Sequence, residues 1–525
     1  MRFTLLALAA LMLAFVVTAQ AAAAPVLVVD GPRATIREDP YLPGPAGLGA
    51  APERVAGAAS AGRLAVTLGA PPSAIPMAGA AEASGTPASN GRAARFAAAK
   101  PKKRTFKGEL RKYLSARRID QPTYDGARRA YDRARRALRA LSGLRARELG
   151  ATLSTLDWMV ADRRLSPTRV PALTLTLVRN RELWAKAQTL PAPRGRVEFA
   201  GSEIVFEYYA GQGLNIQPLG TFGKANGLWT AGDQNERLRR LFDEMVPLMV
   251  RRGKALAWEY YFFFGGGRPP WVSGMAQATG LQALSRAITR LGENRWRAVV
   301  PPALTLFELP SPTGVRVRTP AGNHYLQYSF SPGTRIINAF LQSVIGLYEA
   351  GEQLADPRAR RLAELVDAQA RAELPLYDTG AWGLYSMGGA EADLDYFRLA
   401  RSFLKRLCDR IRATEYCNTY RAWSDDLRNP PETRLITTRA TAKRAAPLRF
   451  RLDKVSHVGV AVDDPAGRDV FFVEGDFARG TRFVTWTPPS AGLHEVRIEA
   501  TDLAGNKKET SATVDVAPAP PKEDE

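Results

Sequence analysis

Residues 323–351 read NHYLQYSFSPGTRIINAFLQSVIGLYEAG, and residues 374–387 read LPLYDTGAWGLYSM. A third stretch of similar composition, WEYYFFFGGGRPPWVSGMAQATGLQALSRA, covers residues 258–287. In all three, Tyr, Trp and Gly gather at the boundaries between expected elements, where a core does not need them. Phenols and indoles beside Gly-rich turns form a cleft that grips sugar rings, and a phenol is an acid/base group other than His or a carboxylate. The three stretches therefore predict a domain with a carbohydrate cleft at its loops.

The apolar spacing around these stretches predicts a mainly α, multidomain chain. A strand or strand pair, VEFAGSEIVFEYYAG, precedes a long Gly-punctuated loop at 211–229. A short hairpin is expected at roughly 313–330. Helices are expected at 233–252, 272–292, 296–308, 334–350, 358–373, 395–413 and 415–427. Their spacing favours antiparallel helix pairs with the loops at one end, which is the outline of an α/α toroid, or incomplete barrel, over residues 111–430.

The composition divides the rest of the chain into further segments. Residues 25–110 are rich in Ala, Gly and Pro and are predicted to be a disordered linker. A shift to Thr, Arg, Ala and Pro at 430–448 marks a second linker. Short alternating strands at roughly ten-residue spacing over 447–517 predict an immunoglobulin-like β-sandwich. Residues 518–525 form a disordered tail in this prediction.

The composition of residues 1–24 predicts that the chain begins with a secretory signal peptide. An uncleaved signal anchor is the alternative, but the apolar run is shorter than the ~20 residues that a membrane span needs. We therefore expect a secreted protein that is extracellular or associated with the cell envelope. In an exported chain a pair of cysteines is usually a disulfide, so we predict a bridge between Cys408 and Cys417, with two buried thiols as the alternative.

The net charge of +21 is concentrated in one region. Residues 92–147 hold nineteen Lys and Arg against four Asp and Glu. This segment is either an arm that holds an anionic polymer or the cell envelope, or a solvated linker followed by a surface helix. Nucleic acid is excluded because the chain is exported and carries no nucleic-acid module. The sequence leaves open whether the protein forms a homodimer.

The few histidines argue against metal chemistry. His324, His457 and His494 are scattered along the chain, and no Cys/His spacing fits a metal site. A His-based triad is excluded for the same reason. We therefore predict no metal and no cofactor. The composition, which is rich in Arg and Ala and poor in Lys, indicates a bacterial origin.

Three ordered blocks of this chain resemble one known family. PPWVSGMAQATGLQALSRA, at 269–287, is similar to a hallmark of the D-glucuronyl C5-epimerase C-terminal domain family. QYSFSPGTRIINAFLQSVIGLYEAG, at 327–351, resembles the family's block that ends in N-G-F and G-L-Y-D, and LPLYDTG, at 374–380, resembles its LPLYDTG block. The upstream LNIQPLGTFG is similar to a further loop, more weakly. The resemblance covers roughly 200–425 and implies inversion at C5 of a uronic acid within a polysaccharide.

The resemblance carries three tyrosines over by motif: Tyr328 in QYS, Tyr385 in GLYS and Tyr396 in DYF. Inversion needs a base on one face of the sugar, an acid on the other, and stabilisation of the charge that develops on the carboxylate. A phenol in a polar, basic pocket can ionise and exchange these roles. We predict that Tyr328 and Tyr396 are the acid/base groups and that Tyr385 positions the carboxylate or takes over one role. The alternative for each is a hydrogen-bonded core tyrosine.

Five further residues are predicted to bind substrate. Trp271 stacks on a sugar face, with core packing as the equal alternative. Gln277 faces out of the first turns of its helix and hydrogen-bonds the polymer. Arg268 and Arg335 lie on loops beside the motifs, where either could pair with a uronate carboxylate or remain a surface arginine. Gln327 stands where the family commonly has Glu.

The predicted function is C5-epimerisation of uronic acid residues, of the D-glucuronate to L-iduronate type, in an extracellular or envelope polysaccharide. A polysaccharide lyase shares the first step, abstraction of the C5 proton, and then loses the O4 substituent. A non-catalytic glycan-binding envelope protein would keep the cleft without turnover. In each case the predicted partner is an acidic, uronate-containing polysaccharide.

Overall fold

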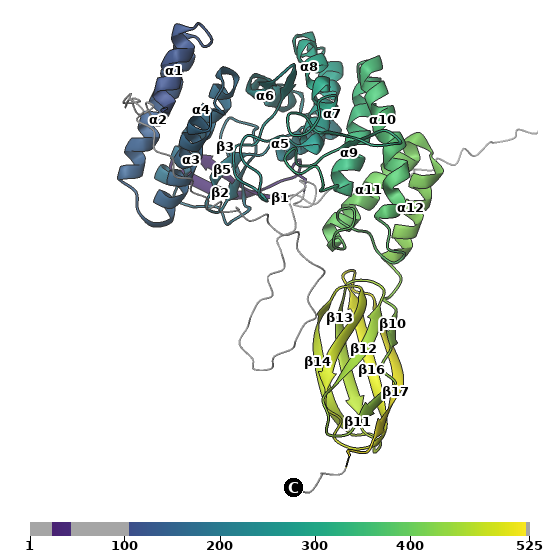
Figure 1. The fold of residues 1–525 in the computed structure, drawn as a ribbon. Helices are drawn as coiled ribbons and strands as arrows, with labels where there is room; N and C mark the ends of the chain where they lie inside the picture. The colour runs from purple at the N-terminus through teal and green to yellow at the C-terminus, as the bar shows by residue number, and fades with distance from the viewer. Residues whose placement is uncertain (1–23, 44–103, 521–525) are drawn as a thin grey trace, which may run out of the picture.

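The computed structural model describes residues 24–43 and 104–520, which form a mainly helical part and a C-terminal β part (Figure 1). Residues 1–23 of the predicted signal peptide, most of the first predicted linker and the end of the tail lie outside these residues. Within the described residues, none of the helices is long and apolar enough to cross a membrane. The α-helices are α1 Phe106–Ser115, α2 Gln121–Arg139, α3 Gly143–Ala161, α4 Val170–Lys186, α5 Pro218–Ala231, α6 Asn235–Met245, α7 Gly274–Leu291, α8 Val300–Leu304, α9 Ile337–Gln353, α10 Pro357–Glu373, α11 Leu394–Ile411 and α12 Thr414–Asp426.

Helix α7 packs against α5 on one side and α9 on the other. Its start is fixed by Ser273, whose hydroxyl accepts a hydrogen bond from the main-chain N–H of Ala276. A side chain at Gly346 of α9 would meet the main chain of Ala278 at 2.5 Å, so only glycine lets the two helices approach this closely. Helix α9 also packs against α10 and α11, and α11 packs against α12. The predicted helices from 272–292 onward are thereby confirmed, except that 296–308 is divided between short 3₁₀ turns and α8.

A five-stranded sheet lies beside the first helices, in the order β2-β1-β3-β4-β5. Strand β1 pairs antiparallel with β2 and parallel with β3, where Leu27 lies opposite Val197. Residues 25–43 are therefore ordered, as is the start of α1, and their prediction as disordered is wrong. Composition reports only local residues, whereas β1 is stabilised by a strand far along the chain. The strands are β1 Ala24–Asp30, β2 Arg33–Asp39, β3 Arg196–Phe199, β4 Phe206–Tyr209 and β5 Gly213–Ile216.

Two short hairpins complete the helical part: β6 Val250–Arg252 with β7 Ala255–Ala257, and β8 Arg316–Arg318 with β9 Asn323–Tyr325. The second of these confirms the hairpin expected at 313–330.

The prediction of a long loop at 211–229 is wrong, because most of this segment forms β5 and α5. Pro218 occupies the first turn of α5, where a missing N–H costs nothing. The glycines suggest a loop, but at Gly227 a Cβ would lie 2.4 Å from the carbonyl oxygen of Tyr41. That glycine therefore serves the close packing of the helix against the segment after β2.

The C-terminal part is a β module of two sheets, with orders β10-β12-β15 and β11-β17-β16-β13-β14. Its core contains Trp486, which is 1% exposed and packs inside as expected. The second predicted linker, 430–448, instead contributes β10 and β11, which pair with β12 and β17. The module therefore begins earlier than predicted. Its strands are β10 Thr433–Leu435, β11 Arg439–Thr441, β12 Ala446–Leu452, β13 Ser456–Asp463, β14 Asp469–Phe477, β15 Gly480–Trp486, β16 Gly492–Asp502 and β17 Lys507–Ala517.

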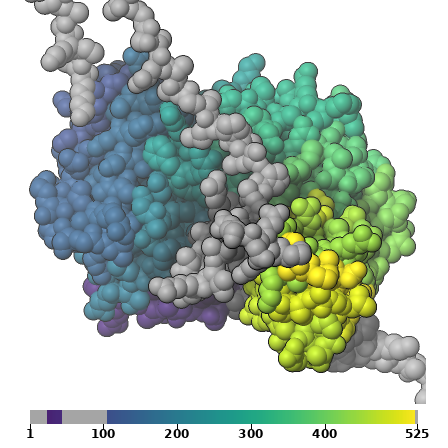
Figure 2. All heavy atoms as spheres, turned by 60° about the horizontal axis from the view of Figure 1, so that its bottom comes forward, coloured from purple at the N-terminus to yellow at the C-terminus, as the bar shows by residue number. Residues whose placement is uncertain are grey.

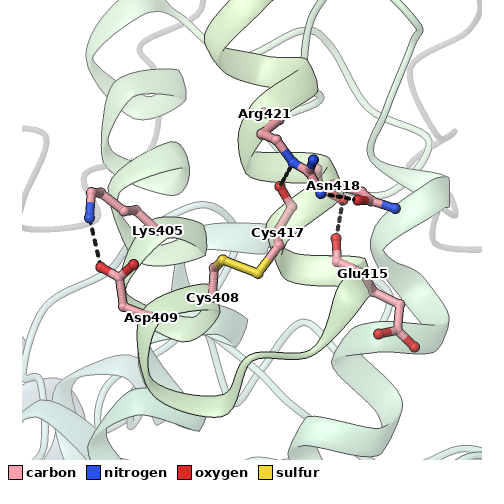
Figure 3. The surroundings of a disulfide bond; sticks show 8 residues. Lys405, Cys408, Asp409, Glu415, Cys417, Asn418 and Arg421 are labelled. Carbon is pink, nitrogen blue, oxygen red and sulfur yellow. Dashed lines mark hydrogen bonds and ion pairs between the residues drawn. A yellow bond between two sulfur atoms is a disulfide. The ribbon is translucent and has the colours of Figure 1, made fainter.

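The predicted bridge between Cys408 and Cys417 is present and joins α11 to α12 (Figure 3). The two Cα atoms lie 4.8 Å apart, within the range that a disulfide requires. Helix α11 carries Tyr396 in its first turn and Cys408 in its last, so the bridge fixes the far end of the helix that bears a predicted catalytic residue.

Candidate active site

The three predicted tyrosines come together in the structure, and we call them the tyrosine cluster. Tyr328 follows the β8–β9 hairpin, Tyr385 follows α10, and Tyr396 lies in α11. The rings of Tyr385 and Tyr396 lie edge to face with their centroids 5.0 Å apart. Tyr328 and Tyr385 lie close enough that each acts on the pKa of the other. Each side chain is less than a tenth exposed: 7%, 9% and 5% in chain order.

Local main-chain bonds hold the cluster in place. Asp393 caps α11 by accepting the N–H of Tyr396 at 2.8 Å, which fixes the start of the helix. Tyr385 donates its N–H to the carbonyl of Ala390 and accepts the N–H of Ile337, so its loop is tied to α9. On Tyr328, the ring contacts Phe264, Trp271 and Phe330. The cluster is therefore set into an aromatic core that holds it rigidly.

Burial favours the neutral form of all three phenols. Burial raises the pKa of Tyr328 to about 12, while the Tyr385 hydroxyl, the Arg194 charge and Gln327 act in the opposite direction. Burial, followed by the neighbouring tyrosines, raises the pKa values of Tyr385 and Tyr396 further. Tyr328 is therefore the phenol in the cluster that ionises most readily.

The hydroxyl of Tyr396 is buried and has no hydrogen-bond partner among the described residues. A buried hydroxyl without a partner costs free energy, and such groups in native proteins call for a specific reason. A ligand that brings its own polar atoms to this point would satisfy it. The orphan hydroxyl is thus consistent with a site that is completed by substrate.

A second set of polar residues lies beside the cluster, and we call Arg194, Glu207, Tyr209 and Gln217 the Arg194 group. Arg194 pairs with Glu207 at 3.0 Å, and its guanidinium lies 4.7 Å from the centroid of the Tyr209 ring. The charge of Arg194 lowers the pKa of Tyr396 as well as that of Tyr328, against the larger effect of burial. Arg194 therefore lies close enough to act on both predicted acid/base groups.

Gln217 links the group to the aromatic core. Its amide nitrogen donates to Glu207 at 2.9 Å and to the Tyr209 hydroxyl at 2.8 Å, and its oxygen accepts from Tyr260 at 3.0 Å. The weak resemblance of LNIQPLGTFG includes Gln217, but nothing in the sequence singled out Arg194, Glu207 or Tyr209. One usable signal is the strand FEYY of β4, where a carboxylate stands in an otherwise aromatic, buried run.

Two predicted substrate contacts are corrected by burial. Gln277 is 1% exposed and donates to the carbonyls of Leu256 and Ala303, so it does not face a polymer. Trp271 is 4% exposed, stacks on Tyr260 with centroids 4.2 Å apart and donates to the carbonyl of Phe262. Trp271 belongs to the core that supports the tyrosine cluster, which was its equal alternative.

The other three predicted substrate contacts, Arg335, Arg268 and Gln327, each lie in a different environment. Arg335 pairs at 2.8 Å with Glu373, which lies 2.8 Å from His324 as well. The carboxylate that Arg335 binds in the structure is therefore internal to the protein. Arg268 is exposed on its loop. Gln327 is buried next to Tyr328 and accepts a bond from the Ser273 hydroxyl at 3.4 Å.

Comparison with known proteins finds a match for one segment. Residues 252–425 match the model of the D-glucuronyl C5-epimerase C-terminus. A D-glucuronyl C5-epimerase of Caenorhabditis elegans is 32% identical over 132 residues, which cover 23% of this chain and 21% of that protein. The chain thus spans about a fifth of the length of this curated relative. The tyrosine cluster lies inside the matched segment, and the Arg194 group lies upstream of it.

Solved structures add no information on the fold. An engineered protein covers 47% of this chain and is itself 47% covered, with a TM-score of 0.15 and 17% identity. A double mutant of an endo-beta-1,4-mannanase from Cellulomonas fimi covers 47% of this chain and is 45% covered, with a TM-score of 0.13 and 16% identity. Scores this low support no conclusion.

Proposed function

We propose that this protein inverts C5 of uronic acid residues in an acidic polysaccharide, because residues 252–425 match the model of the D-glucuronyl C5-epimerase C-terminus. The single observation that carries the proposal is the tyrosine cluster. Three buried phenols meet at one point. The hydroxyls of two, Tyr385 and Tyr396, have no hydrogen-bond partner among the described residues, and the charge of Arg194 acts on Tyr328 and Tyr396. A core has no need of such an arrangement.

The proposed reaction has two proton transfers. The phenolate of Tyr328 takes the C5 proton, and the electron pair of the C–H bond passes into the uronate carboxylate as an enediolate. Tyr396 then donates its phenolic proton to C5 from the opposite face, which inverts the centre and leaves Tyr396 as the phenolate. Exchange of roles between the two tyrosines allows the reverse reaction. Tyr385, which lies near both, positions the carboxylate.

Arg194 replaces Arg335 in our proposal as the residue that binds the uronate carboxylate. Its side chain is 32% exposed and its charge acts on both predicted acid/base groups, whereas Arg335 is held by Glu373. A guanidinium can bind a carboxylate through two parallel N–H···O bonds and stabilise the charge of the enediolate. Glu207 holds the guanidinium in the free protein and keeps it near the cluster.

The architecture and location are part of the proposal. The paired helices α7, α9, α10, α11 and α12 fit an incomplete α/α toroid with the tyrosine cluster at its loops, and the β module fits an immunoglobulin-like sandwich. We propose export, by the N-terminal signal. The basic segment, of which residues 104–147 are described, is proposed to hold the acidic polysaccharide or the envelope.

Deuterium exchange tests this function directly. The protein is incubated in D2O with a uronan, and NMR follows loss of the C5 proton signal. Epimerisation predicts deuterium at C5 together with the inverted sugar, whereas ultraviolet absorbance from an unsaturated product would reveal a lyase. Binding of the uronan without any exchange would identify a non-catalytic glycan-binding protein and overturn the proposal.

A further inference from the structure

The β module meets the helical part at a buried lysine. Lys454, in the turn between β12 and β13, is 1% exposed. Its ammonium donates to the carbonyls of Asp426 and Asn429 at 2.9 and 2.7 Å, and to the carboxylate of Asp502 at 3.2 Å. These three acceptors satisfy all three of its N–H groups. Asp426 is the last residue of α12, so the ammonium also meets the negative end of a helix.

A second link involves the loop that carries Tyr385. The two carboxylate oxygens of Glu391 accept the main-chain N–H groups of Val455 and Arg479 at 3.2 and 3.3 Å, both in the β module. In its own loop, Glu391 is bridged to Leu384, the residue before Tyr385. One end of the hairpin that holds Tyr385 is therefore attached to the module.

A third path leads from the lysine to Tyr396. The ammonium of Lys454 lies 5.6 Å from the centroid of the Trp382 ring, at a distance typical of a cation–π contact. Trp382 is fully buried and stacks on Phe397 with centroids 4.0 Å apart. Phe397 directly follows Tyr396 on α11. Trp382 also donates its indole N–H to the carbonyl of Ala392, which closes the same loop.

We propose that the C-terminal β module is a positioning element of the active site, acting through Lys454 and Glu391 on the loop 382–393. A module that was merely tethered would need neither a buried lysine shared between the two parts nor a carboxylate that spans them. Figure 2 shows the module, in yellow-green and yellow, lying against green residues of the helical part. The catalytic consequence rests on the proposed function, whereas the ordering of the loop does not.

Two variants of the full chain test the proposal. Lys454→Met keeps the apolar stem but removes the three donated bonds, and Glu391→Gln keeps the size of the side chain but removes its charge. In hydrogen–deuterium exchange, the amides of 382–393 should exchange on the order of tenfold faster in each variant, because bonds from this loop to the module are weakened. The kcat for C5 exchange should fall on the order of tenfold with little change in KM, since Arg194 is untouched.

The matched control is Asp464→Asn. The Asp464 carboxylate also accepts two main-chain N–H groups, those of Ala466 and Arg468, but within a turn of the module itself. This variant should change neither loop exchange nor kcat. If the amides of α7 also exchange faster in Lys454→Met, that variant has unfolded the helical part. Glu391→Gln is then the variant that tests the positioning role of the module.

The outcomes separate this proposal from the proposed function. Unchanged loop exchange in Glu391→Gln and in folded Lys454→Met would overturn the positioning role, as would a loosened loop with kcat unchanged. A wild-type protein that never exchanges C5 protons would refute the proposed function, while the loop amides would still report whether the module orders the loop.

Discussion

The tyrosine cluster and the Arg194 group lie near each other but are built in opposite ways. The cluster sits on two loops and on the first turn of α11, inside the matched segment, and the hydroxyls of Tyr385 and Tyr396 have no hydrogen-bond partner among the described residues. Each member of the Arg194 group is held by another, through Glu207 and Gln217. Under the proposed function, the difference is a division of work: the Tyr396 hydroxyl is left for the substrate to satisfy, while the charge that assists the reaction is fixed in a network.

The largest effect should come from the cluster. Tyr328→Phe or Tyr396→Phe should lower C5 exchange by on the order of 10²-fold or more, the scale of one general acid/base group. Each variant removes only a hydroxyl, and that of Tyr396 has no partner among the described residues, so its melting temperature should stay nearly unchanged. NMR exchange rates and thermal melts measure both quantities.

Tyr416→Phe is the matched control for these variants. Tyr416 is fully buried like the cluster, but its hydroxyl donates to Asp367 at 2.8 Å. This variant should lose about 1–3 kcal/mol of stability because a buried carboxylate loses a partner, and should keep its exchange rate. Full activity in both cluster variants would show that the tyrosines are structural.

The next largest effect should separate Arg194 from Arg335. Arg194→Met should lower kcat/KM roughly 10- to 100-fold, the range expected for a lost charge-assisted hydrogen bond. Arg335→Met should mainly lower stability, because it leaves the buried Glu373 without its arginine. The reverse result, with Arg335→Met inactive and Arg194→Met active, would restore the arginine that the sequence suggested.

The sequence predicted the cluster but not its partners, for a physical reason. Tyr328, Tyr385 and Tyr396 lie in motifs whose local pattern identifies them. Arg194 and Glu207 become neighbours only when the turn before β3 meets β4, and no local pattern contains that pairing. Arg194 adopts a left-handed backbone with φ of 66°, which is unusual for a residue other than glycine and is invisible in the sequence.

The errors at Gln277 and in the fold have a related origin. The first turns of α7 are buried on every side, so the helix offers no outward face on which a polar residue could be placed. Helix periodicity located helices such as α10 and α11 because each has an exposed polar face beside a buried apolar one. Strand β1 and helix α5 were missed because their stability comes from β3 and Tyr41, which are distant in sequence.

The pH profile should sharpen the role of Tyr328. Its pKa is raised to about 12, so the phenolate fraction and the exchange rate should rise roughly tenfold per pH unit below that value. The same raised pKa stabilises the fold below the ordinary tyrosine value near 10, and this contribution is lost between about pH 10 and 12. The rate should therefore climb until alkaline unfolding begins. A flat profile between pH 6 and 9, measured by initial rates, would contradict a tyrosine base.

The disulfide should affect stability more than chemistry. Cys408 and Cys417 are nine residues apart in sequence, and closing such a loop stabilises by about 2–3 kcal/mol on the chain-entropy estimate. Cys408→Ser should lower the melting temperature and should reduce exchange less than Tyr396→Phe does. Two free, alkylatable thiols in mass spectrometry of the non-reduced protein would show that the bridge does not form.

The smallest effect should come from the basic face of α2. This helix is distant in sequence from both the tyrosine cluster and the Arg194 group. Its exposed arginines include Arg128, Arg129, Arg133, Arg135 and Arg136. Replacing all five with Gln should weaken uronan binding at low salt on the order of tenfold, because each exposed ion pair contributes about 0.2–1 kcal/mol. The loss should shrink as added salt screens these contacts.

A control of equal charge shows whether position matters on this face. Five exposed basic residues of the β module, changed to Gln together, lower the net charge by the same amount: Arg434, Lys443, Arg444, Arg449 and Arg451. If the arginines of α2 form a track for the polymer, only their loss weakens binding strongly. Equal weakening by both sets would mean that the total charge attracts the uronan, and no weakening by the α2 set would leave its arginines as a solvated face.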